Sequence, residues 1–170
     1  MNTIQRRERL MELLEKADGA VSATALAHTL SVSRQIIVGD IALLRAAGER
    51  ITATPRGYVI LRETGGLVRQ VACRHTAPAD MARELNIMVD NGCTVVNVIV
   101  EHQVYGQLVG QLDLSNRYDV SEFIQAVEAH GARPLSDLTG GIHLHTLRCP
   151  EEGAYRRVTQ ALKEAGILLT

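Results

Sequence analysis

Tryptophan is absent from this 170-residue sequence, and phenylalanine occurs once. With 46% hydrophobic residues but only 3% aromatic ones, the cores must be built mainly from Leu, Ile, Val and Ala. No uninterrupted apolar stretch approaches the roughly 20 residues needed to span a bilayer, and the amino end MNTIQRRERLMELLEK is too charged for a signal peptide. We therefore expect a cytoplasmic protein that has no membrane partner.

Cysteine is scarce as well. The chain has Cys73, Cys93 and Cys149, and no two of them form a C-x-x-C pair. Their odd number and wide spacing argue against a disulfide framework. We interpret them as buried thiols.

The net charge is only −1, but it is divided unevenly along the chain. Residues 1–62 carry nine Lys/Arg against six Asp/Glu, whereas residues 63–170 carry nine against thirteen. A basic first third is typical of a segment that meets an anionic partner, so nucleic acid is a candidate there.

Three helices are predicted in this first third. Apolar residues recur at helical spacing in residues 3–16, 23–30 and 34–48. The three residues 31–33 leave room only for a tight turn between the second and third helices, which is the helix-turn-helix arrangement. Its last helix inserts its first turn into the major groove of DNA.

Two β-rich runs, 50–54 and 57–61, flank a Pro-Arg-Gly turn and predict the hairpin of a winged helix. Arg and Gln at the start of the third helix match the edges of guanine and adenine, and an Arg at the hairpin tip suits phosphate or the minor groove. The candidate DNA-contacting residues are Ser22, Ser33, Arg34, Gln35 and Arg56. A small protein-interaction domain is the alternative, but the short turn, the polar helix start and the positive charge favour DNA.

The rest of the chain alternates strand and helix patterns after a Gly-containing linker at residues 63–68. The order is β-α-β-β-α-β with one more helix and a final short strand, ILLT. This order predicts an α/β (α+β) fold, a ferredoxin-like βαββαβ sandwich with an added helix and strand. We therefore expect two domains, a winged helix-turn-helix at 1–62 and a ligand-binding domain at 69–170.

Two histidines, His143 and His145, lie two residues apart in a predicted strand, so they share one face with their Cβ atoms roughly 6 to 7 Å apart. His75 ends an earlier strand, and Glu84 lies on the following helix, where it could turn toward the sheet. Together the four would offer three imidazoles and one carboxylate, a set suited to zinc, nickel or iron(II). The alternative is that each histidine simply makes ordinary hydrogen bonds.

Two further side chains are candidates for an organic ligand beside the metal. His102 and Tyr105 lie in the loop between two predicted strands, where they could contact such a ligand or be solvated turn residues. Thiolate ligation is a less favoured option, because Cys73 shares a strand face with His75, and Cys149 with His145, but neither cysteine is needed to complete the metal's ligands.

Several strings of the sequence resemble a known family. VSRQIIVGDIALLR followed by ATPRGYVI is similar to the winged helix of the niacin-responsive transcriptional repressors. VIVEHQVYGQL, NRYDVSEFI and PLSDLTGGIHLHTL resemble their ligand domain, called the 3H domain for its three characteristic histidines. The resemblance covers nearly all of residues 3–169. One departure is Gln103 after His102, where the family usually has proline.

The resemblance implies a homodimeric repressor of genes for NAD-precursor synthesis or uptake, acting on double-stranded operator DNA. It implies nicotinic acid as corepressor and a divalent metal ion, nickel or zinc with iron possible, in the 3H domain. The family's metal ligands match His75, Glu84, His143 and His145 of this sequence.

No catalytic residues are expected, because no nucleophile and base arrangement is visible around the histidines. Two alternatives stay open at this stage. In one, the same His/Glu set activates water in a metalloenzyme fused to a DNA-binding head. In the other, the metal itself is the signal, and DNA affinity follows the metal alone.

Overall fold

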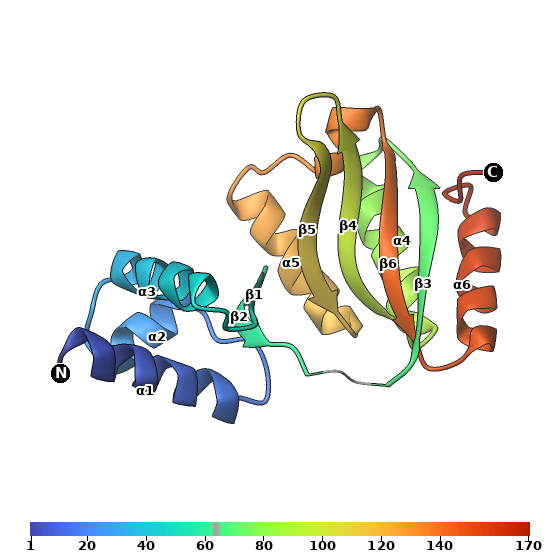
Figure 1. The fold of residues 1–170 in the computed structure, drawn as a ribbon. Helices are drawn as coiled ribbons and strands as arrows, with labels where there is room; N and C mark the ends of the chain where they lie inside the picture. Colours follow the sequence, from blue (N-terminus) through green and yellow to red (C-terminus); the bar gives the residue numbers. More distant parts are fainter. Residues whose placement is uncertain (63–64) are drawn as a thin grey trace. The chain divides into compact units, whose positions relative to one another are not determined.

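The computed structural model describes residues 1–62 and 65–170 (Figure 1). Glu63 and Thr64, the first two residues of the expected linker, lie outside the described residues. The chain divides into two compact units, residues 1–63 and 64–170, each with its own hydrophobic core. No helix in the described ranges is both long enough and apolar enough to cross a membrane.

The first unit consists of three helices and a hairpin. They are α1 (Thr3–Lys16), α2 (Ala23–Leu30), α3 (Arg34–Ala46), β1 (Ile51–Thr54) and β2 (Gly57–Ile60). The helical spacing of apolar residues buries Leu10, Leu26, Ile37 and Ile41 in one core, so each helix turns its apolar side inward. The turn between α2 and α3 passes through Ser31, which adopts a left-handed conformation at φ 54°.

A buried ion pair connects α1 to α3. Asp40 is 3% exposed, and its two carboxylate oxygens accept hydrogen bonds from the Nε atoms of Arg6, at 2.6 Å, and Arg7, at 3.0 Å. The hydrogen bond from Arg6 lowers the pKa of Asp40 and, with the bond from Arg7, outweighs the opposite effect of burial. The orientation of α3, the expected recognition helix, is thus fixed by charge as well as by packing.

The second unit is a four-stranded antiparallel sheet with helices. Its elements are β3 (Leu67–Arg74), α4 (Pro78–Asp90), β4 (Thr94–His102), β5 (Gly106–Leu114), α5 (Arg117–Ala129), the 3-10 helix η1 (Leu135–Thr139), β6 (Ile142–Cys149) and α6 (Glu152–Glu164). The expected α+β class and the βαββαβ order are both present. The short helix η1 was not expected from the sequence.

The strand order of the sheet is β3-β6-β4-β5. The last strand, β6, therefore lies between β3 and β4, whereas in a ferredoxin-like sheet the second strand of the hairpin, here β5, occupies that place. The reason lies in β6 itself, because every second residue, from His143 to Cys149, is buried. A strand that must be covered in this way belongs at the centre of the sheet, and the central place puts its histidines beside both β3 and β4.

The final segment ILLT forms less sheet than expected. It makes one isolated bridge, between Leu168 and Cys73, on the outer edge of β3. Backbone N–H groups of Arg74 and Leu169 donate to the carbonyls of Ile167 and Ala72. The chain end thus covers part of an edge strand without forming a strand of its own.

The core of the second unit lies between one face of the sheet and its helices. Buried residues of α4, α5 and α6, among them Leu85, Val120 and Leu162, pack against Val95 and Leu147 of the sheet. Figure 1 shows α4 and α5 behind the sheet and α6 beside β3. The candidate metal ligands lie on this covered face.

Candidate metal centre and nucleic-acid interface

Three histidine side chains converge on one buried carboxylate. The Glu84 side chain is 2% exposed, and its Oε1 lies 2.7 Å from Nε2 of His143. Its Oε2 lies 2.8 Å from Nε2 of His75 and 3.3 Å from Nε2 of His145. The structure thus brings together all four residues that the sequence proposed as metal ligands.

Strand alternation and register explain why these side chains meet. On β6, His143 and His145 point to the covered face, and they pair across the strands with Cys73 and Val71 of β3. His75 follows β3 on the same side. Glu84 lies on α4 next to the buried Leu85, so the packing of α4 directs its carboxylate toward the sheet.

Two of the imidazoles are oriented by backbone carbonyls. Nδ1 of His143 donates to the carbonyl of Gly141, and Nδ1 of His145 donates to the carbonyl of Asn97, each at 2.8 Å. In a neutral imidazole this leaves Nε2 as the atom with the lone pair, and both Nε2 atoms face Glu84. Among the described residues, Nε2 of His145 is buried without a hydrogen-bond partner, since its approach to Glu84 has ion-pair distance but not hydrogen-bond geometry.

The electrostatics of the cluster favour a positive charge. Burial alone would raise the pKa of Glu84, but the charge of His145 and the contacts from all three histidines outweigh it and hold that pKa well below its usual range. The pKa of His143 is raised, because the hydrogen bond and charge of Glu84 overcome the opposing effect of burial. Glu84 is therefore an anion surrounded by nitrogen atoms that need a shared proton or a cation.

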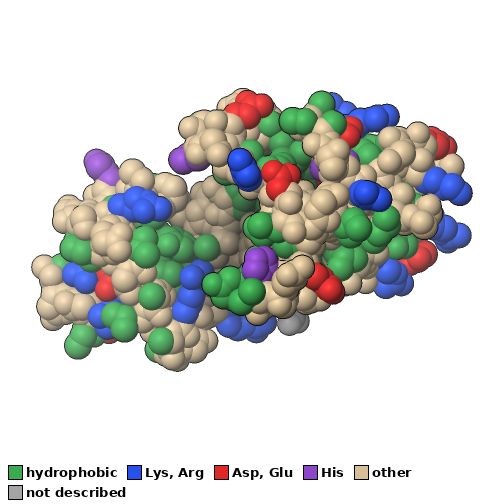
Figure 2. Space-filling view, turned by 90° about the horizontal axis from the view of Figure 1, so that it is seen from above, with side chains coloured by type: hydrophobic (Ala, Val, Ile, Leu, Met, Phe, Trp, Pro, Cys, Tyr) green, Lys and Arg blue, Asp and Glu red, His purple; other side chains and the backbone are tan. Residues whose placement is uncertain are grey.

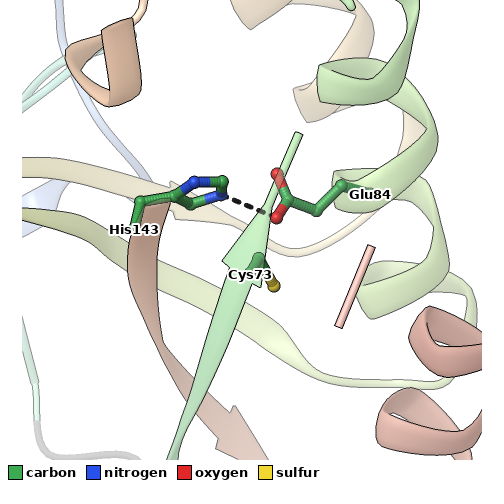
Figure 3. Close-up of side chains that lie close together, drawn as sticks. All are labelled: Cys73, Glu84 and His143. Carbon is green, nitrogen blue, oxygen red and sulfur yellow. Dashed lines mark hydrogen bonds and ion pairs between the residues drawn. The ribbon is translucent and has the colours of Figure 1, made fainter. Parts of the chain in front are cut away.

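Cys73 is a fifth member of the cluster, and the sequence gave it less weight than the histidines. The potential ligand atoms of Cys73, Glu84 and His143 all lie within 4.8 Å of one another (Figure 3). Burial and then the nearby charge of Glu84 raise the pKa of the Cys73 thiol. The sequence signal for this cysteine was its position two residues before His75, on the same strand face.

A pocket of about 360 Å³ adjoins the cluster through His75. Its apolar walls include Met81, Ile124 and Val127, and Arg133 offers a cation at its rim. The sequence did not point to these residues, because they come from α4, α5 and the loop before η1, and no local pattern links those segments. A pocket with apolar walls and few polar groups is typical of a site for a small organic ligand.

The two residues expected to contact an organic ligand lie in the hairpin between β4 and β5. Nδ1 of His102 accepts hydrogen bonds from the backbone N–H groups of Val104 and Tyr105, at 3.1 and 3.3 Å. The Tyr105 side chain is exposed, and its ring lies 5.2 Å from that of His102. The contacts described for this pair are those of a hairpin turn, and neither residue lines the pocket beside His75 in the described ranges.

The candidate DNA-contacting residues gather at the start of two helices and the hairpin. Ser22, Arg34 and Arg56 line one cavity of about 280 Å³ between the N-termini of α2 and α3 and the β1–β2 turn. The Ser33 hydroxyl accepts from the backbone N–H of Ile36 and so caps α3, while Gln35 is exposed on its first turn. Figure 2 shows basic side chains distributed over the visible face of this unit. Backbone N–H groups at helix starts and two arginines are suited to phosphate and base contacts.

Comparisons with known proteins place both units in described families. A family model named "3H domain" matches residues 68–170, and one named "HTH domain" matches residues 6–59. The chain is 45% identical over 172 aligned residues to the "Probable transcription repressor NiaR" of Thermotoga maritima, covering 99% of this chain and 97% of that relative. It is 40% identical over 168 residues to the "Transcription repressor NadR" of Bacillus subtilis, covering 96% and 93%.

Proposed function

The chain belongs to the family of DNA-binding transcription repressors that join a helix-turn-helix domain to a 3H domain, and from this premise we propose that it controls genes of NAD-precursor synthesis or uptake. It would bind double-stranded operator DNA in the cytoplasm as a homodimer, with nicotinic acid as corepressor. A divalent metal ion, nickel, zinc or iron(II), would be held by His75, Glu84, His143 and His145. The two relatives are named as repressors, which are not enzymes, so we assign no catalysis to the cluster.

The observation that carries the metal proposal is the direction of the imidazole lone pairs. Nδ1 of His143 and Nδ1 of His145 are both committed to backbone carbonyls, so both Nε2 atoms face the Glu84 anion. Histidines that bind a metal usually donate their other ring N–H in this way. Three nitrogen donors and one carboxylate oxygen are a suitable set for zinc, nickel or iron(II), and the partnerless Nε2 of His145 gains a partner when such an ion binds.

The pocket beside His75 supports a small aromatic acid as effector. A divalent ion in a site with an open position offers that position to a carboxylate. Met81 and Val127 supply apolar contacts for a ring, and the Arg133 guanidinium supplies a charge for an anion. His102 and Tyr105, which the sequence suggested for the pyridine end, are the rival contact.

Repression would follow if nicotinic acid favours a dimer whose recognition helices lie about one DNA turn, or a multiple of it, apart. A coupling of about 1 to 3 kcal/mol would change operator affinity about 5- to 150-fold. In this dimer Arg34 and Gln35 would read bases, while Ser22, Ser33 and Arg56 would position the backbone.

The decisive experiment measures binding to a duplex that the protein itself selects from a random pool. Affinity is compared with and without nicotinic acid, before and after chelation of metal. The proposal expects tight binding only when metal and nicotinic acid are both present. If affinity follows the metal and ignores nicotinic acid, the chain is a metal-responsive regulator; if chelation changes nothing, the metal part of the proposal is wrong.

Variants separate the two candidate ligand contacts. Arg133→Ala should weaken the response to nicotinic acid if the pocket binds it, and the exposed Arg83→Ala on α4 is the matched control. His102→Ala and Tyr105→Phe should leave the response unchanged in that case. The reverse pattern would assign nicotinic acid to the hairpin.

A further inference from the structure

We propose that Cys73 binds the metal ion through its thiolate, so that the centre combines sulfur with imidazole and carboxylate ligands. This inference rests on the proposed function, since it requires a metal ion in the 3H domain. It concerns a residue outside the His/Glu set that the family resemblance implies.

The position of Cys73 in the sheet brings it to the centre. Cys73 and His143 are direct cross-strand partners in the β3–β6 register, and both side chains face the covered side. Directly opposed residues of an antiparallel pair have Cβ atoms about 4.5 to 5.5 Å apart, which is close enough for two side chains to reach one ion. Cys73 is 0% exposed, so its sulfur meets protein atoms and not water.

The neighbours of the sulfur are ligand atoms. Sγ of Cys73, a carboxylate oxygen of Glu84 and a ring nitrogen of His143 all lie within 4.8 Å of one another. Figure 3 shows these side chains entering one small space from β3, α4 and β6. Among the described residues this is the set of three potential ligands that satisfies so close a mutual spacing.

The other two cysteines show what a purely structural thiol looks like in this core. Cys93 and Cys149 are buried, and their sulfur atoms contact each other at 2.7 Å. A buried cysteine commonly packs as a small apolar residue. Cys73 differs, because its sulfur faces a carboxylate and an imidazole, an environment that suits a ligand better than an apolar side chain.

The chemistry of ligation is simple. When the divalent ion binds, the thiol proton passes to solvent and the sulfur shares its electron pair with the ion, with no electron transfer. A thiolate in the ligand set favours zinc, iron(II) or nickel over magnesium, calcium or manganese, which prefer oxygen. Cys73 would therefore narrow the choice of metal beyond what the histidines and Glu84 do.

The test loads the full-length protein with cobalt(II), which takes the same ligand types as zinc. We expect a thiolate-to-cobalt charge-transfer band in the near ultraviolet, retained in Cys93→Ala and Cys149→Ala and lost in Cys73→Ser and Cys73→Ala. The affinity for cobalt(II) should fall more than about tenfold in the Cys73 variants, the lower end of the loss that follows even changes behind a metal ligand. X-ray absorption at the cobalt edge of the unmodified protein should show one sulfur neighbour, a readout that does not require any variant to fold.

Each other outcome is informative. If cobalt(II) binds but neither the band nor a sulfur neighbour is present, Cys73 is not a ligand, and the proposed His/Glu site stands. If the band persists in Cys73→Ser, the sulfur comes from another residue and the inference is overturned. If elemental analysis finds no bound cobalt, zinc or nickel, the proposed metal site fails and the inference fails with it.

Discussion

Nε2 of His143 lies 2.7 Å from Oε1 of Glu84, although the two residues are 59 positions apart in the sequence. The contact joins the central strand β6 to helix α4, and it lies in the interior of the second unit, where both side chains are 2% exposed. A buried carboxylate is costly unless it is paired, so this contact makes the core of the 3H domain depend on a charge.

Replacement of that carboxylate should therefore abolish metal binding. Glu84→Gln keeps the size of the side chain but removes the negative charge, and we expect metal affinity to fall by about 100-fold or more, beyond the usual loss from changes behind a ligand. Equilibrium dialysis followed by elemental analysis measures it. The exposed Glu164→Gln at the end of α6 is the control. Equal affinity in Glu84→Gln and wild type would remove Glu84 from the centre.

The metal-free protein should lose stability as pH rises above neutral. The folded pKa of His143 is raised, so its contribution is fully present below the unfolded pKa of about 6.5 and is lost as pH rises through the folded pKa. The folded pKa of Glu84 is lowered, so its contribution is lost only as pH falls through that value in acid. Thermal unfolding with a chelator present, from about pH 6 to about pH 9, should give a falling midpoint.

His143→Gln should flatten this alkaline decline, because the titrating group is gone. Saturating metal should reverse it, since deprotonated ligands bind a metal ion more tightly as pH rises. A midpoint that stays level or increases with pH in the chelated wild type would contradict the charge assignment.

Gly141 should tolerate no side chain. Its φ is 94°, and an added Cβ would lie 2.4 Å from the carbonyl oxygen of His75. Its own carbonyl accepts from Nδ1 of His143 and from the backbone N–H of His75, so a shift would disturb two histidines at once. Gly141→Ala should lower the free energy of unfolding by more than about 1–3 kcal/mol and weaken metal binding.

The neighbouring glycine is the matched control. Gly140 also has positive φ, 63°, but an added Cβ would meet open space, so Gly140→Ala should cost only about 1–2 kcal/mol. Chemical denaturation of both variants compares them. If Gly140→Ala weakens metal binding as much as Gly141→Ala, the effect is one of the loop and not of the histidine contacts.

Arg34→Ala should reduce sequence-specific binding more than non-specific binding. Arg34 is exposed on the first turn of α3, where its guanidinium can pair with a guanine edge, a contact worth about 1–3 kcal/mol of discrimination. Titrations of selected and unrelated duplexes at one salt concentration measure both affinities. Arg9→Ala, which removes an exposed partner of Glu12 on α1, is the control. Equal losses on both duplexes would mean that Arg34 contacts phosphate alone.

Some of the site could be predicted from the sequence because it follows from strand and helix periodicity. Alternation placed His143 and His145 on one face, and the caps Ser22 and Ser33 with the short turn between them indicated the helix-turn-helix. The orienting carbonyl of Asn97 could not be predicted, because every residue has a carbonyl and only the fold selects the one that faces an imidazole.

The sequence by itself determined the two kinds of domain, the α+β class, the helix starts and the pairing of two histidines on one strand, because these depend on contacts among near neighbours in the chain. Only the tertiary structure decided that β6 lies between β3 and β4, that Cys73 stands opposite His143, and that Glu84 receives three imidazoles. These relationships depend on which strands pair, and strand pairing is set by the burial of whole faces across distant segments, which no local pattern encodes.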